Sequence, residues 1–126
     1  MFYKSTLLNC TALTKIGLIS DTHGWLDEAV LPHFTHCDEI WHAGDFGNQQ
    51  DVDTLQDLKP LRGVYGNIAD NSIRRQYPEK LVFTCEEMTV FMQHIGGYPG
   101  RYAPGVKKDI INHKAGIFIS GHSHIL

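Results

Sequence analysis

The chain has 126 residues, of which 42% are hydrophobic and 20% are charged, and its formal net charge is −3 with histidine neutral. This length suffices for one domain with a hydrophobic core but not for two. The acidic balance argues against a nucleic-acid-binding surface as the main function, because such surfaces are normally basic. No apolar run is long enough to span a membrane, so we expect no membrane association. The scattered cysteines predict reduced thiols and a cytoplasmic location; they are Cys10, Cys37 and Cys85.

The first half of the chain alternates apolar runs with amphipathic segments. We expect residues 1–14 to form a loose extension, or a degenerate targeting segment, and residues 15–126 to form a single domain. The predicted elements are a strand at 15–20, a helix at 27–34, a strand at 39–43, a helix at 50–58 and a strand at 61–65. This order predicts an α/β fold with a parallel sheet and helical crossovers.

The second half begins with a polar stretch at 67–78. Two strands joined by a tight turn follow at 80–84 and 88–93, and a loop rich in glycine and proline covers 96–105. A helix is predicted at 106–113 and a last strand at 116–120.

Polar residues follow the predicted strands at the points where the strands end. In open α/β sheets the carboxyl ends of the strands face one crevice, so we expect these residues to converge at one edge. Seven of their side chains offer oxygen or imidazole donors, which suit borderline divalent ions such as Mn, Fe, Co, Ni or Zn. Seven donors are too many for one small ion but fit two ions that share a carboxylate. The motifs are Asp21-Thr22-His23-Gly24, Gly44-Asp45, Gly66-Asn67, His94 and Gly121-His122-Ser123-His124.

The order and spacing of these motifs resemble the calcineurin-like metallophosphoesterase superfamily, whose pattern runs DxH, GD, GN, H and GHxH. The likeness covers residues 15–126 and is closest to the small single-domain branch. That branch includes phosphodiesterases and shares its fold with a non-catalytic vacuolar sorting subunit of the retromer coat. The resemblance implies a four-layer α/β/β/α sandwich. It also implies a hydrolase that cleaves phosphodiester bonds with a hydroxide bridging two metal ions, manganese being favoured over Fe, Zn, Ni or Co.

The resemblance gives each matching residue a role. Asp45 is expected to bridge both ions, and Asn67 is expected to touch the phosphate as well as a metal. The implied catalytic residues are Asp45, Asn67 and His94. Besides Asp45, the implied metal ligands are Asp21, His23 and His124 for the first ion and Asn67, His94 and His122 for the second.

Some positions depart from the family pattern. Ile68 stands where many phosphomonoesterases carry a histidine that protonates the leaving group, and isoleucine cannot give a proton. We therefore expect a small phosphodiester or an activated aryl ester as the substrate, with nucleic acid bound only as a substrate. Ala69 stands where the small branch often has an aspartate, although Asp70 follows it, and Gln93 replaces a small hydroxyl residue.

The chain ends two residues after the last motif, whereas family members continue with further strands. We therefore expect the last strands of the second sheet to be missing, which would expose an edge of the strand at 116–120. Two alternatives to an enzyme stay open. One is a non-catalytic scaffold of the same fold that binds protein partners, and the other is an inactive truncated fragment. The sequence also leaves the oligomeric state open, including a homo-oligomer.

Several motif residues also have a purely structural interpretation. Asp21 could cap a helix, Asn67 could serve only as a turn residue, and the histidines of the last motif could be solvated. The occurrence of all five motifs in order favours the ligand interpretation. Four other histidines fit no motif and are expected to be surface or core residues: His33, His36, His42 and His113. Three further residues could contact substrate but are explained more simply by packing or solvation: Trp25, Tyr98 and Arg101.

Overall fold

One sheet of the structure is parallel at its centre. This computed structural model describes residues 2–6, 13–22, 26, 28–67, 71–98 and 101–121. The sheet has the order β1-β2-β3-β4, with bounds Phe2–Thr6, Leu13–Ile19, Glu39–His42 and Leu61–Gly63. The last three of these strands run parallel, as predicted. β1 pairs antiparallel with β2, so the expected loose extension is wrong for residues 2–6. That short segment has no apolar run that would predict a strand. Its backbone hydrogen bonds with β2 make it a strand.

The other sheet has the order β5-β6-β9, with bounds Lys80–Cys85, Met88–Ile95 and Ile117–Gly121. β5 and β6 form the predicted hairpin, and β9 runs parallel to β6. The hairpin turns at Glu86 and Glu87, whose φ angles of 49° and 68° are typical of a tight two-residue turn. A small hairpin of β7 (Gly97–Tyr98) and β8 (Arg101–Tyr102) lies in the segment expected to be a loop.

Helical segments connect the strands. The predicted helices appear as η1 (Glu28–Phe34), which is a 3-10 helix, and as α1 (Gln49–Leu58) and α3 (Val106–His113). An additional helix, α2 (Asn71–Gln76), lies in the stretch predicted only to be polar. Ile73 is its one buried residue, so no helical periodicity shows in the sequence. Tertiary contacts hold this short helix instead, including hydrogen bonds between the side chains of Gln49 and Gln76.

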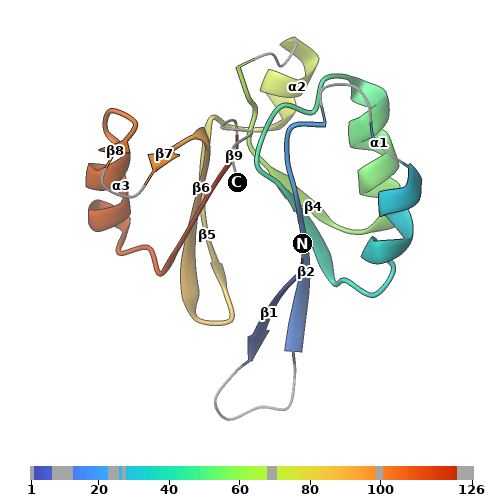
Figure 1. Cartoon of the computed structure of the whole chain (residues 1–126), viewed down its shortest axis with the longest axis horizontal. Helices are drawn as coiled ribbons and strands as arrows, with labels where there is room; N and C mark the ends of the chain where they lie inside the picture. Colours follow the sequence, from blue (N-terminus) through green and yellow to red (C-terminus); the bar gives the residue numbers. More distant parts are fainter. Residues whose placement is uncertain are drawn as a thin grey trace.

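The elements stack in four layers (Figure 1). From left to right, Figure 1 shows α3, the sheet of β5, β6 and β9, the sheet that contains β2 and β4, and α1. The expected α/β/β/α sandwich is therefore confirmed. No helix within the described ranges is long and apolar enough to cross a membrane. Cys37 and Cys85 are free thiols.

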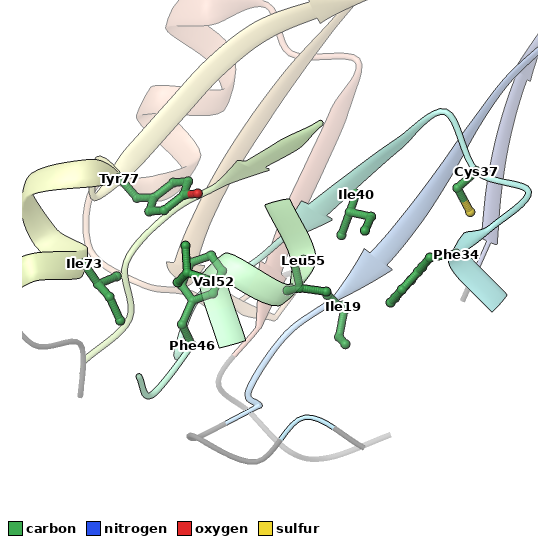
Figure 2. Packing of buried hydrophobic residues seen from close by; sticks show 9 residues of the cluster. All are labelled: Ile19, Phe34, Cys37, Ile40, Phe46, Val52, Leu55, Ile73 and Tyr77. Atoms are coloured by element: carbon green, nitrogen blue, oxygen red, sulfur yellow. The ribbon is translucent and has the colours of Figure 1, made fainter. Parts of the chain in front are cut away.

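The parallel sheet separates two hydrophobic layers. Its helical face packs against a cluster shown in Figure 2: Ile19, Phe34, Cys37, Ile40, Phe46, Val52, Leu55, Ile73 and Tyr77. A second cluster joins the two sheets: Ile16, Trp41, Ala43, Val64, Val90, Met92 and Ile119. Neighbouring residues of β3 enter opposite layers, as strand alternation requires. Burial of each large side chain stabilises the fold by roughly 1.5–3 kcal/mol, so packing on both faces holds the sheet in place.

Candidate metal centre

The centre lies where four chain segments meet at the carboxyl edge of the sheets. Asp21 follows β2, Asp45 follows β3 and Asn67 follows β4. His94 lies in β6, where the pairing with β9 shifts register between Met92 and Ile95. Such an irregularity can turn a side chain toward a site. The structure thus brings together four of the seven residues that the motifs singled out.

Asp21, Asp45 and His94 form a close group. The Nε2 atom of His94 lies 3.1 Å from Asp45 Oδ2 and 3.7 Å from Asp21 Oδ1. One ligand atom from each residue lies within 4.8 Å of the others, a spacing that lets one ion contact all three. The side chains of His94, Asp45 and Asp21 are 2%, 1% and 13% exposed. Burying two neighbouring carboxylates is costly unless a positive charge compensates.

A backbone contact sets the tautomer of His94. Its Nδ1 atom lies 2.7 Å from the carbonyl oxygen of Ala43. Since a carbonyl oxygen only accepts, Nδ1 carries a proton and donates it. In the neutral ring Nε2 then holds a lone pair, and this lone pair faces the carboxylates of Asp45 and Asp21. This is how metal-binding histidines are commonly oriented by a second partner.

The amide of Asn67 closes another side of the group. In one orientation its oxygen faces only acceptor atoms, which belong to Asp45 and His94. In the opposite orientation its nitrogen donates to Asp45 Oδ2 at 3.0 Å and to His94 Nε2 at 3.2 Å. A cation placed among these acceptors would favour the first orientation, and its removal would favour the second. Carboxylate, imidazole and amide donors therefore fit a divalent ion here.

Two glycines allow the close approach of the segments. A Cβ atom on Gly66 would lie 1.8 Å from Asp45 Oδ1 and 2.5 Å from the Asp45 nitrogen. A Cβ atom on Gly121 would lie 2.6 Å from Ser20 Oγ and 2.8 Å from Asp21 Oδ2. The end of β9 therefore reaches the Asp21 side of the centre. Any side chain at either position would displace a carboxylate.

The backbone of both aspartates is unusual. Asp21 and Asp45 have φ angles of 57° and 61°, in the left-handed region that non-glycine residues seldom adopt. The Asp21 N–H donates to the Gly44 carbonyl at 2.9 Å, and the Ser20 hydroxyl donates to Asp21 Oδ2. Such conformations concentrate at functional sites and need support from their surroundings.

His42, which fits no motif, lies inside the core. It is fully buried and stacks on Phe46 with 3.7 Å between ring centroids. Burial lowers the pKa of His42 to about 3; His94 also lowers it, while Asp21 acts in the opposite direction. His42 is therefore neutral near pH 7. The other three unassigned histidines are exposed, as expected for surface residues: His33, His36 and His113.

Comparison with known proteins assigns the family. Residues 14–126 match the calcineurin-like phosphoesterase superfamily domain. The chain belongs to this superfamily. A probable metallophosphoesterase from Methanothermobacter thermautotrophicus is 32% identical over 114 residues, which cover 86% of this chain and 66% of that relative. The chain thus spans just under two thirds of the length of this calcineurin-like relative.

Solved structures of similar shape support the fold. An archaeal phosphodiesterase has a TM-score of 0.70 at 19% identity, over 87% of this chain and 73% of that one. The zinc complex of Vps29 from Entamoeba histolytica has a TM-score of 0.68 at 16% identity, over 88% of this chain and 65% of that one. At these identities the likeness concerns the calcineurin-like fold alone.

Several residues with predicted roles lie outside the described part of this calcineurin-like domain. They are the metal-ligand candidates His23, His122 and His124, the departure positions Ile68, Ala69 and Asp70, and Trp25, together with the side chain of Tyr98. Their roles stay predictions. The ligand roles of the four residues that the structure brings together are also predictions.

A cavity of about 210 Å³ adjoins the Asn67 and His94 side of the centre. Its lining includes Arg74 from α2, a residue that the sequence did not single out, because an arginine on a short polar helix has no distinctive pattern. The Arg74 guanidinium lies over the Tyr65 ring, 4.8 Å from its centroid. Gln93 also lines the cavity. Arg101, considered earlier as a substrate contact, lines a different cavity with Lys107 and Lys108.

Proposed function

We propose that this calcineurin-like domain is a metal-dependent phosphoesterase that hydrolyses phosphodiester bonds. The observation that carries the proposal is the set of acceptor atoms from Asp21, Asp45 and His94 turned toward one buried space. A bare imidazole nitrogen facing carboxylates is expected where a divalent cation binds. The family supports the same coarse activity.

Each residue of the centre has a proposed role. Asp45 lies between Asp21 and Asn67 and would bridge two ions, with His94 beside it. When bound, two divalent ions would lower the pKa of a bridging water to give a hydroxide nucleophile and would neutralise phosphoryl oxygens; Mn²⁺ is the favoured metal. Asn67 would hold one phosphate oxygen through its amide. By sequence, the remaining ligands are His23, His122 and His124.

Two features favour a diester as the substrate. Ile68 offers no proton for a leaving group, so a poor leaving group would depart slowly. The cavity beside Asn67 and His94 offers space for a second ester group, and its lining includes the guanidinium of Arg74 as well as the carboxylate of Glu79. A guanidinium pairs well with phosphate oxygens. The proposed substrate class is therefore a small phosphodiester.

The test compares bis-p-nitrophenyl phosphate with p-nitrophenyl phosphate, each with Mn²⁺ and with a chelator. We expect hydrolysis that requires Mn²⁺ and favours the diester. Asp45→Asn should lower kcat/KM by more than about 100-fold, because loss of a bridging ligand should exceed the loss caused by an outer-shell partner. Asp57→Asn removes the same charge from an exposed position of α1 and should leave kcat/KM unchanged.

The alternative is a non-catalytic scaffold that binds protein partners. The observation in its favour is the similarity in fold to Vps29. A folded chain that binds Mn²⁺ but hydrolyses neither ester would support the scaffold and contradict the proposed activity. An unfolded chain, detected by circular dichroism, would instead support the inactive-fragment alternative.

A further inference from the structure

His42 and Thr22 form a hydrogen-bonded link beneath the candidate metal centre. The Gly44 N–H donates to His42 Nδ1 at 3.0 Å. Because Nδ1 accepts, the ring proton lies on Nε2, which is 3.1 Å from Thr22 Oγ1. The low pKa that burial gives His42 keeps the ring singly protonated near neutral pH. Nε2 therefore donates to the Thr22 hydroxyl.

The Thr22 hydroxyl continues the series of hydrogen bonds to the segment that carries Asp45. Thr22 Oγ1 lies 3.0 Å from the carbonyl oxygen of Phe46 and 3.3 Å from that of Asp45. Having accepted from His42, the hydroxyl can donate its single proton to either of these two carbonyls, of which that of Phe46 is the nearer. The series therefore runs from Gly44 through His42 and Thr22 to the backbone around Asp45. All of its donors and acceptors are matched in direction.

The link connects the two segments that carry the aspartates. Thr22 follows Asp21 directly, and the bonded backbone groups of Gly44 and Phe46 flank Asp45. The bond from Asp21 N–H to the Gly44 carbonyl closes the connection on the other side. Both aspartates have left-handed φ angles, so neighbouring contacts must hold their carboxylates in place.

We infer that His42 and Thr22 are positioning residues that fix Asp21 relative to Asp45, so that both carboxylates can bind metal. This inference rests on the proposed metal centre but assigns a role to residues outside its ligand set. A core residue that only packs would contribute to stability and leave the metal affinity of the folded protein unchanged. A positioning residue would affect that affinity directly, as outer-shell partners of metal sites do.

Thr22→Val tests the hydroxyl with little change of shape, and Thr22→Ser restores the hydroxyl while removing the methyl group. Mn²⁺ affinity is measured by calorimetric titration at a temperature where circular dichroism shows all variants folded. We expect Thr22→Val to weaken Mn²⁺ binding by about 10–100-fold and Thr22→Ser to stay within about threefold of the wild type. Equal affinities for Thr22→Val and the wild type, or equal losses in both variants, would overturn the inference.

His42→Leu removes both ring nitrogens, whereas Phe46→Leu removes only the stacked ring beneath them. We expect His42→Leu to lose as much Mn²⁺ affinity as Thr22→Val and Phe46→Leu to lose stability but keep its affinity. Nitrogen-15 NMR of the metal-free wild type should show the His42 proton on Nε2, and a proton on Nδ1 would overturn the inference. A wild type that binds no Mn²⁺ would overturn the metal centre and this inference together. Mn²⁺ binding without ester hydrolysis would overturn only the proposed activity.

Discussion

The ends of β3 and β6 each carry a buried histidine. The Nδ1 atoms of the two histidines make backbone hydrogen bonds of opposite direction. His42 accepts from the Gly44 N–H, whereas His94 donates to the Ala43 carbonyl. These two backbone groups belong to one peptide unit. That unit therefore leaves the Nε2 proton on His42 and, in the neutral ring of His94, an Nε2 lone pair. Residue type and burial are the same in both regions, so the direction of one backbone contact distinguishes the proposed metal ligand from the proposed positioning residue.

The largest effect is expected from removing the lone pair that faces the carboxylates. His94→Phe keeps a ring in the buried space but offers no ligand atom, and it should weaken Mn²⁺ binding by more than about 100-fold. His113→Phe is the matched control, because that histidine is exposed on α3. Calorimetric titration measures both affinities. An unchanged affinity in His94→Phe would show that the two histidines do not differ as proposed.

The next effect concerns the carboxylate that His94 faces. Gly66→Ala would place a Cβ atom 1.8 Å from Asp45 Oδ1, so the carboxylate must move. We expect a loss of Mn²⁺ affinity of at least about tenfold, comparable with the loss of an outer-shell partner. Gly105→Ala is the control for added volume, because a Cβ atom there meets nothing within 4 Å. Its positive φ of 82° predicts some loss of stability but no change in affinity. Retained affinity in Gly66→Ala would contradict the tight placement of Asp45.

The neutrality of His42 predicts a pH dependence of stability. The folded-state pKa of about 3 lies below the ordinary value of 6.5. Unfolding therefore takes up a proton between these two values, so this contribution to stability is complete above pH 6.5 and falls as the pH drops toward 3. The loss from His42 between pH 7 and pH 5 should be about 2 kcal/mol. Urea unfolding at both pH values should show this loss in the wild type and a smaller one in His42→Leu. Identical pH dependence in the two proteins would mean that His42 titrates normally.

The smallest effect is expected from Arg74, which lines the cavity beside Asn67 and His94. Arg74→Met should raise KM for the diester about tenfold, as loss of a charged hydrogen bond of ~1.5 kcal/mol would do, with less change in kcat. Arg75→Met is the matched control, because Arg75 lies on the same helix and does not line this cavity. Steady-state kinetics on bis-p-nitrophenyl phosphate distinguish them. Equal KM values in Arg74→Met and Arg75→Met would show that Arg74 does not contact the substrate.

Much of the fold could be predicted because its signals are local. The apolar runs before Asp21 and Asp45 predict β2 and β3, and the pattern at 106–113 predicts α3. Residues that lack such a signal were not anticipated. α2 has only Ile73 as a buried residue, and its contacts with Gln49 come from a distant part of the chain.

The candidate site also contains residues that the sequence predicts and residues that it does not. The motifs singled out Asp21, Asp45, Asn67 and His94 because polar residues directly after strands share one edge of a sheet. Nothing in the sequence separates His42 from other core histidines. Its tautomer depends on one backbone N–H and one hydroxyl that only folding brings to it.

The sequence by itself determined the predicted strands, the predicted helices and the order of the motifs, because apolar periodicity and turn residues act over short stretches of chain. The tertiary structure decided which side chains meet, which histidine keeps a lone pair and which arginine reaches the cavity. These outcomes depend on distances between residues far apart in sequence, such as His94 and Ala43. A pattern of residue types carries no information about the direction of such a contact, whereas the folded backbone fixes it.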